Sequence, residues 1–324
     1  MSLRTHAIMV VRDECDIIEE CVEHIMSWAT SLTILDTGSV DGTWEALGVL
    51  ANADSRIDLM PRQSLFFEQR VRSMVFARAR AKMRSGDWFV RADADEFYPV
   101  PPPEFIKEYA RRTDGHVIRR AYDVQIRRSD LERFARYDET ERAGFWKSLE
   151  YCIENDYHVE PRIFRYRNTM KWSSANNAPF HAGPPCSERI VIQHYQHRNP
   201  VQIIKRVALR TVLARMRRKI GDTSGSHWDD YSLDNIVVDD NDPRLLPLIE
   251  AVRDADRNAP RPVSRKKRIA YLPIARQLVD LTRPGYQGDT DFSEMPEDAE
   301  RQISAEYANA EKRVRQMLDQ MNLP

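Results

Sequence analysis

The chain has 324 residues, of which 42% are hydrophobic, and this length is enough for one large core or two modest ones. The formal net charge of -1 argues against wholesale binding to nucleic acid. The four cysteines show no Cys-x-x-Cys spacing, which suits a reducing compartment, and no stretch approaches the roughly 20 apolar residues that span a bilayer. We therefore predict a cytoplasmic protein that is either free or peripheral at the inner face of a membrane.

The first elements are a strand, a helix and a second strand. The apolar run His6–Val11 predicts a buried strand, and apolar residues recur with helical spacing from Ile17 to Trp28. Leu32–Leu35 predict the second strand. Two strands joined by a helix of this length form a right-handed β-α-β unit with parallel strands. Ligands of such sheets bind beyond the carboxyl ends of the strands, so the residues that follow each strand are candidates for a site.

A glycine-rich loop, Asp36-Thr37-Gly38-Ser39-Val40-Asp41-Gly42-Thr43, follows the second strand. It lacks the Gly-x-Gly-x-x-Gly spacing of a dinucleotide-binding turn, and Gly38 and Val40 stand where a calcium loop needs oxygen ligands. The simplest interpretation is a turn in which Ser39 or Asp41 caps the next helix. That interpretation leaves Asp36 unexplained.

A third strand ends in a cluster of carboxylates. Trp88–Val90 predict the strand, and Asp93-Ala94-Asp95-Glu96-Phe97 follow it. Residues i and i+2 of a strand share a face, so Asp93 and Asp95 point the same way, and like charges this close need a metal or a shared proton. Oxygen ligands of this kind suit Mg²⁺ or Mn²⁺. The alternative is an acidic turn that caps the next helix.

These motifs together resemble those of the family-two glycosyltransferases of the GT-A fold. The resemblance is clear to about residue 100 and fainter at Arg162–Arg165 and His194–Arg198. It implies an α/β fold with a mostly parallel central sheet flanked by helices, formed by residues 1–200, and a mainly helical extension over residues 201–324. The segments that carry it are Val11-Arg12-Asp13-Glu14, Leu35–Thr43, Gly86-Asp87-Trp88 and Asp93–Phe97.

The resemblance implies an enzyme, a glycosyltransferase of the hexosyltransferase class, which moves a sugar from a nucleotide-sugar donor to an acceptor hydroxyl with inversion. Asp36 would hold the base, Asp93 would lie near the ribose and the metal, and Asp95 would bind Mn²⁺ or Mg²⁺ directly. His194 would be a third metal ligand, although a lone histidine is more often a packing residue. The other donor-binding residues implied are Arg12, Glu14, Ser39 and Arg72.

Attack by the acceptor needs a general base, normally a carboxylate. The position of the base in the family points to Glu188, and Glu96 is the second candidate. The alternative for Glu188 is a surface glutamate beside Arg189. The sequence leaves the acceptor open among a glycan such as a surface polysaccharide, a lipid-linked oligosaccharide, a protein and a small molecule. The resemblance suggests a role in polysaccharide or glycoconjugate synthesis.

Residues 201–220 predict a basic helix with one apolar face, and a last helical pattern runs from Asp298 to Met321. The basic helix is interpreted as an ordinary surface helix or as a peripheral membrane contact. The last helix would pack on the core or pair with another subunit.

Three other functions stay open. A nucleotidyltransferase also uses paired carboxylates and a metal, but it needs a basic, glycine-rich loop after the first strand, where Arg12-Asp13-Glu14 stand. A metal-dependent hydrolase needs a second cluster of His and Asp ligands, which the spacing does not show. The third is a non-catalytic module that binds a nucleotide or a glycan on the same fold.

Overall fold

The computed structural model of the protein describes residues 3–65, 68–155, 160–172, 179, 182–219, 236–257 and 297–320. The chain forms two compact units, which we describe separately. Unit 1 comprises residues 1–121, 155–193 and 252–294, and unit 2 comprises residues 122–154, 194–251 and 295–324. These units group residues by proximity, so the predicted domain boundary at residue 200 stays a prediction.

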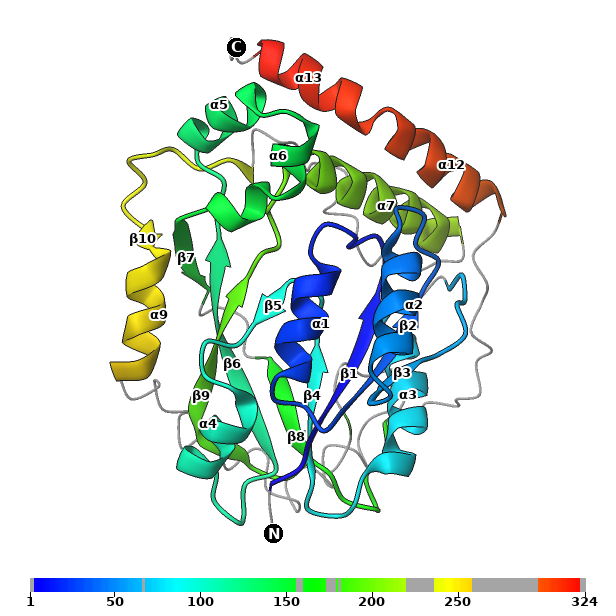
Figure 1. Ribbon diagram of the computed structural model, residues 1–324, viewed down its shortest axis with the longest axis vertical. Coiled ribbons are helices and arrows are strands. Elements are labelled where there is room, and N and C mark those ends of the chain that lie inside the picture. The colour runs from blue at the N-terminus through cyan, green and yellow to red at the C-terminus, as the bar shows by residue number, and fades with distance from the viewer. Residues whose placement is uncertain are drawn as a thin grey trace. The chain divides into compact units, whose positions relative to one another are not determined.

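The sheet of unit 1 has the strand order β6-β8-β4-β1-β2-β3 (Figure 1). β1 is parallel to β2 and β4, and β2 is parallel to β3, whereas β8 is antiparallel to both β4 and β6. A further strand, β9, pairs with β5 and β6. The strands are β1 (Thr5–Val11), β2 (Ser31–Asp36), β3 (Ile57–Leu59), β4 (Trp88–Ala92), β5 (Glu96–Phe97), β6 (His116–Val124), β8 (Pro161–Arg165) and β9 (Pro185–His194).

Helices cover both faces of this sheet. Every residue of β2 and β4 is buried, as expected for central parallel strands. Alternate side chains divide the core: Met9 packs in a cluster with residues of α1, α2 and α4, and Ile8 packs in a second cluster with residues of α3. The helical segments are α1 (Ile18–Met26), α2 (Thr43–Ala53), α3 (Glu68–Ala79), η1 (Arg80–Lys82) and α4 (Pro102–Tyr109).

The predicted α/β fold, with parallel strands and flanking helices, is confirmed. The three predicted strands, which are β1, β2 and β4, lie where the apolar runs place them, within two residues at either end, whereas β3 was not predicted. β4 extends to Ala92 and therefore includes Arg91, a charged residue that is almost completely buried. The antiparallel position of β8 was not predicted, because its partners β4 and β6 are distant in the sequence.

Unit 2 is mainly helical. α12 and α13 pack on α7, and the buried face of α7 includes Ile203, Leu209 and Val212. The predicted last helix is thus two helices, separated at Asn309, and both pack on α7. The elements are α5 (Arg128–Arg136), α6 (Glu139–Ala143), η2 (Phe145–Ser148), β7 (Tyr151–Asn155), α7 (Pro200–Lys219), β10 (Leu246–Pro247), α9 (Leu248–Arg257), α12 (Glu297–Ala308) and α13 (Ala310–Gln320).

The predicted basic helix is α7, which ends at Lys219; Ile220 lies outside the described residues. Because α12 and α13 cover its apolar face, a membrane contact through α7 would have to use its basic side chains alone. Among the helices that the structure describes, none combines the length and the apolar character needed to cross a bilayer.

Candidate functional site

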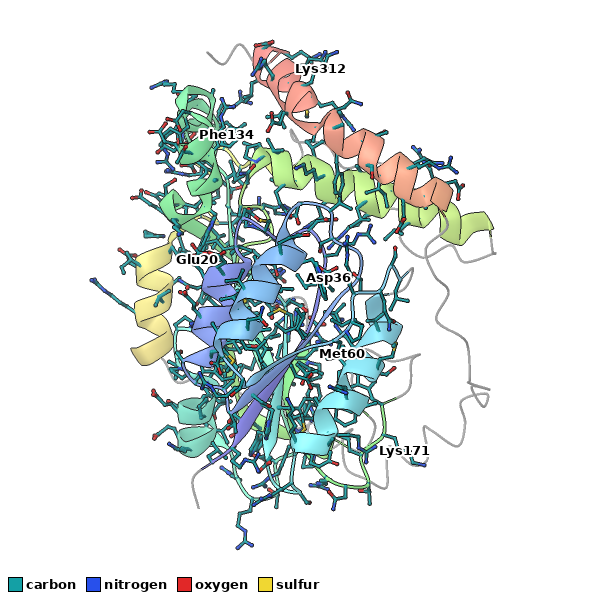
Figure 2. The ribbon with its side chains drawn as sticks, turned by 45° about the vertical axis from the view of Figure 1, so that its right-hand side comes forward. Glu20, Asp36, Met60, Phe134, Lys171 and Lys312 are labelled. Atoms are coloured by element: carbon teal, nitrogen blue, oxygen red, sulfur yellow. The ribbon has the colours of Figure 1, made fainter. Side chains whose placement is uncertain are left out.

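The carboxyl ends of β1, β2 and β4 meet at one edge of the sheet of unit 1, which we call the carboxyl edge. Val11 pairs with Asp36, and Met9 pairs with Ala92. Since neighbouring strands are about 4.8 Å apart, the chain at Asp36 and at Asp93 lies roughly 10 Å apart, on either side of β1. Asp36, Asp93 and Asp95 therefore follow strands that end at this one edge, and Figure 2 labels Asp36 at this end of the sheet.

Asp36 is completely buried and is held by its own loop. Its Oδ1 accepts hydrogen bonds from the main-chain N–H groups of Gly38 and Ser39, both at 2.8 Å. Arg62 Nε lies 3.6 Å from the same oxygen. Oδ2 is also buried, and it has no hydrogen-bond partner within the described part of the chain. Because an unbonded buried acceptor is costly, Oδ2 is an atom that a donor group on a ligand would satisfy.

The loop after β1 is tied to the Asp36 loop through Asp13, which sequence reasoning did not select. Asp13 N donates to Ser39 Oγ at 2.9 Å, and Asp13 Oδ1 accepts from Val40 N at 2.8 Å. Asp13 has φ 55°, which non-glycine residues adopt uncommonly and Asp more readily than most. The Ser39 hydroxyl, predicted to bind the donor, therefore links two loops in this structure.

Arg12 and Glu14 lie on either side of Asp13, and both are half-buried at the carboxyl edge. Arg12 Nη1 donates to the carbonyl oxygen of Thr37 at 2.9 Å. The main-chain N–H of Glu14 donates to Thr43 Oγ1 at 2.9 Å. The two predicted pocket residues thus border the same loop as Asp36, and their contacts to a donor stay a prediction.

Asp93 is held by two arginines. Its Oδ1 accepts from Arg72 Nη2 at 3.0 Å, and its Oδ2 lies 2.8 Å from Arg162 Nη1. Arg162 is almost fully buried and also forms an ion pair with Glu96. Arg72, predicted to contact the donor, is therefore present at the carboxyl edge, and Asp93 positions its guanidinium group.

The ion pairs continue through Glu160. Its carboxylate pairs with Arg91, lies 3.2 Å from Arg119 Nε and lies 3.3 Å from Arg162 Nη2. Burial alone would raise the pKa of Glu160, but the guanidinium groups of Arg162, Arg91 and Arg119 lower it to about 2. Burial, together with two neighbouring guanidinium groups, lowers the pKa of Arg91 to about 9. Glu160 and Arg91 are therefore both charged at neutral pH.

Asp95 is buried at the turn between β4 and β5. Among the described residues, no group of three or more His, Cys, Asp or Glu side chains is arranged to hold a metal ion. Mg²⁺ and Mn²⁺ sites commonly use only one or two carboxylates and take further ligands from substrate phosphates and water. Both oxygens of Asp93 contact arginines, which compensate its charge without a metal ion, and the metal role of Asp95 stays a prediction.

The predicted general bases occupy different surroundings. Glu96 is buried and bound to Arg162. Glu188 is half-buried on β9. It lies on the same face of the strand as Cys186 and Ile190, which belong to the core. Neither role is tested by this geometry, and both stay predictions.

His194 ends β9 and belongs to unit 2. Its Nδ1 lies 2.8 Å from Asp123 Oδ1, a partner that sequence reasoning missed because the two residues are far apart in the chain. A carboxylate on one ring nitrogen orients a histidine for use as a metal ligand or as a base. The metal role of His194 stays a prediction.

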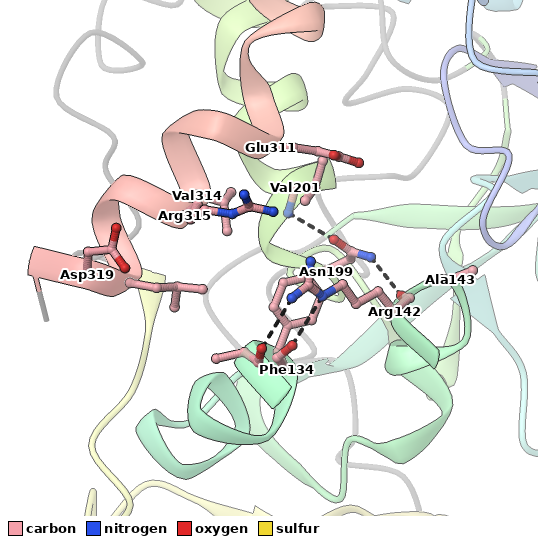
Figure 3. Close-up of a pocket in the computed structure, with 11 residues that line it drawn as sticks. Phe134, Arg142, Ala143, Asn199, Val201, Glu311, Val314, Arg315 and Asp319 are labelled. Carbon is pink, nitrogen blue, oxygen red and sulfur yellow. Dashed lines mark hydrogen bonds between the residues drawn. The ribbon is translucent and has the colours of Figure 1, made fainter. Parts of the chain in front are cut away.

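Unit 2 contains a cavity of about 690 Å³ (Figure 3). Asn199 at the start of α7 lines it, and its Nδ2 donates to the carbonyl oxygen of Arg142 at 3.0 Å. Glu311, Arg315 and Asp319 contribute from one face of α13. Because acidic and basic groups alternate along this wall, the cavity prefers neither anionic nor cationic ligands.

No protein-family model matches the chain, and no curated protein matches it. Among solved structures, it is similar to the mannosyltransferase PcManGT from Pyrobaculum calidifontis in complex with GDP-Man and Mn²⁺, with 15% identity, a TM-score of 0.38 and coverage of 97% of this chain and 87% of that one. It is also similar to a protein described as a candidate glucose-1-phosphate thymidylyltransferase from Bacillus anthracis in complex with sucrose. The identity is 10%, the TM-score is 0.27, and the match covers 40% of this chain and 58% of that one. At these TM-scores neither structure indicates a function for this chain.

Proposed function

We propose that the protein is a glycosyltransferase that takes a sugar from a nucleotide-sugar donor bound at the carboxyl edge. The observation that carries this proposal is Asp36, a buried carboxylate with one oxygen fixed by main-chain N–H groups and the other unbonded among the described residues. An acceptor fixed in this way suits an N–H donor of a nucleotide base. Base edges are recognised by hydrogen bonds to atoms held in place, since an unpaired buried acceptor rejects ligands that lack the donor.

The diphosphate of the donor would lie on the other side of β1, near Asp93 and Asp95. When the sugar leaves, negative charge develops on the phosphate, and fixed positive groups stabilise that charge. Arg72, which Asp93 holds at 3.0 Å, would bind a phosphate oxygen. Asp95 would hold Mn²⁺ or Mg²⁺, which when bound supplies further compensating charge.

Glu188 and Glu96 remain candidates for abstraction of the proton from the acceptor hydroxyl, and His194 remains a candidate metal ligand. The ion pair with Arg162 stabilises the ionised form of Glu96 and so weakens it as a base. The acceptor, as well as inversion at the sugar, stays a prediction that analysis of the product would test.

Thermal unfolding in the presence of nucleoside diphosphates and nucleotide sugars, with and without Mn²⁺, tests the donor site. A ligand at about a hundred times its Kd stabilises the folded state by about 2.7 kcal/mol, which raises Tm. We expect a shift with nucleotides of one base. Asp36→Asn should abolish it, because the amide places a donor where the base needs an acceptor, and Asp95→Asn should abolish the Mn²⁺-dependent part.

Asp54→Asn is the matched control, because Asp54 pairs with Arg56 on the surface, and it should keep the full shift. An unchanged shift in Asp36→Asn would contradict the assignment of the base pocket. Binding without release of nucleoside diphosphate from any nucleotide sugar would favour the non-catalytic module, and release of pyrophosphate from a nucleoside triphosphate would favour a nucleotidyltransferase.

A further inference from the structure

The opposite edge of the sheet of unit 1 carries a cluster of basic side chains. Thr5 at the start of β1 pairs with Trp88 at the start of β4, and Trp88 pairs with Arg165 at the end of antiparallel β8. We call the basic residues of this edge the amino-edge patch. Figure 2 labels one of them, Lys171, and Asp36 toward opposite ends of unit 1. The patch consists of Arg84, Arg111, Arg112, Arg165, Arg167 and Lys171.

Hydrogen bonds connect the segments that carry these residues. Arg165 Nη1 donates to the carbonyl oxygen of Arg112 at 2.5 Å, and Arg165 N donates to the carbonyl oxygen of Gly115 at 2.8 Å. On the other side, Tyr166 N donates to the carbonyl oxygen of Asp87 at 2.7 Å, and Arg84 N donates to Asp87 Oδ2 at 2.8 Å. These bonds join the segment before β4, the end of β8 and the segment before β6, which carry most of the patch.

Within the part of the chain that the structure describes, the acidic residues beside the patch in the sequence and in its hydrogen bonds leave most of its charge uncompensated. Asp114 is buried and accepts from the main-chain N–H of Arg111 at 2.9 Å. Asp87 contacts His6 Nε2 at 3.3 Å and lies 3.6 Å from Arg4. Glu108, near the end of α4, is the exposed carboxylate closest in sequence to Arg111.

The charges of the patch also act on one another. Partial burial, followed by the guanidinium groups of Arg167 and Arg112, lowers the pKa of Arg165, and Asp114 opposes them. This repulsion is a cost of the folded state that an anionic partner would relieve. In a chain of net charge -1, such a local excess of one sign points to an interaction surface rather than to the general composition.

We propose that the amino-edge patch docks unit 1 on the surface of a bilayer that contains anionic phospholipids. Arginine predominates in the patch, and its planar guanidinium group binds phosphate through paired hydrogen bonds. The patch crosses three neighbouring strands and the loops beside them, so it is broad rather than groove-like. The large exposed hydrophobic residues of the described chain, Val40, Val49, Leu246 and Ile249, lie elsewhere, so attraction is electrostatic and involves no insertion.

The same observations disfavour nucleic acid as the partner. Binding to single strands relies on aromatic side chains on which bases stack, and the described residues of the patch include none that is exposed. This proposal does not depend on the proposed function. If both hold, unit 1 docks with its carboxyl edge directed away from the lipid, so that the donor and the acceptor enter from solution.

Co-sedimentation of the full chain with vesicles tests the proposal, with phosphatidylcholine alone compared with an equal mixture of phosphatidylcholine and phosphatidylglycerol. We expect binding to the mixed vesicles only, and its loss as salt rises. A variant with Arg84→Gln, Arg112→Gln and Lys171→Gln should bind about a hundredfold more weakly, because each basic residue near such a surface contributes about 1 kcal/mol.

A control variant removes the same charge from exposed positions of unit 2, through Arg136→Gln, Arg301→Gln and Lys312→Gln, and should bind mixed vesicles almost as the parent does. Equal losses in both variants, or no binding of the parent, would overturn the proposal. Tighter binding of the parent to duplex DNA than to mixed vesicles would overturn it in favour of nucleic acid. An unchanged nucleotide-dependent Tm shift in the patch variant would show that unit 1 is folded and would keep this test separate from that of the donor site.

Discussion

Asp36 and Asp93 lie at the same edge of one sheet, yet different kinds of group hold them. Asp36 is fixed by N–H groups of residues two and three positions further along its own loop. Asp93 is fixed by Arg72 and Arg162, which come from other elements. The first arrangement is local and leaves one oxygen for a ligand, whereas the second is a tertiary network that occupies both oxygens.

This difference separates a carboxylate suited to bind a ligand, Asp36, from one that stabilises the fold, Asp93. A carboxylate held by main-chain groups costs little side-chain entropy to keep in place, and it is ready to receive a ligand. A carboxylate within a buried ion network depends on every partner, since the removal of one leaves the others without compensation. Variants of the two regions should therefore fail in different ways: those of the network in folding, and those of the loop in binding.

Arg162→Ala should have the largest effect. The change leaves Asp93, Glu96 and part of the charge of Glu160 without their shared partner, and breaking a buried ion pair costs about 3–5 kcal/mol. Urea unfolding monitored by circular dichroism would measure this loss. Arg78→Ala, which breaks an exposed pair with Asp58, is the control and should change stability little. A loss in Arg162→Ala as small as that of the control would mean that the network does not support the fold.

The same contrast explains what the sequence could predict. The strand before Asp36 and the turn after it follow from an apolar run and two glycines, so the loop and its place at the carboxyl edge were predicted. The partners of Asp93 could not be predicted, because burial of Arg162 depends on an antiparallel strand whose register is set by tertiary packing. Asp123 beside His194 was missed for the same reason.

Glu160 links the network to pH. Its pKa of about 2 in the folded protein lies below its ordinary value of 4.5, so the unfolded chain binds the proton first as pH falls. The stabilisation, at most about 3 kcal/mol, is present above about pH 4.5 and is lost as pH falls through about 2. Urea unfolding measured across this pH range should show that the free energy of unfolding depends less steeply on pH in Glu160→Gln than in the parent protein. Glu104→Gln, which removes an exposed carboxylate of α4, is the matched control, and equal slopes in the two variants would contradict the assignment.

The smallest effect is expected at Gly38 of the Asp36 loop, and two glycines elsewhere in unit 1, Gly86 and Gly48, complete a graded test. Gly38 has φ +103°, and a Cβ there would lie 3.1 Å from Ser64 Oγ and 3.3 Å from Ser64 Cα. Gly38→Ala should therefore lower the free energy of unfolding by about 1–2 kcal/mol through the strained backbone conformation, and further through the close contact of the new Cβ with Ser64. Gly86 has nearly the same φ but no atom within 4 Å, so Gly86→Ala isolates the conformational part.

Gly48, within α2, has neither a positive φ nor a close neighbour, and Gly48→Ala should stabilise the protein by up to about 1 kcal/mol. Urea unfolding would order the three variants as Gly38, Gly86 and Gly48, from the least to the most stable. Because the Gly38 N–H also fixes Asp36 Oδ1, Gly38→Ala should in addition weaken the nucleotide-dependent Tm shift, which Gly86→Ala should leave intact. If Gly38→Ala lost stability but kept the full shift, the main chain of this loop would not be what prepares Asp36 for a ligand.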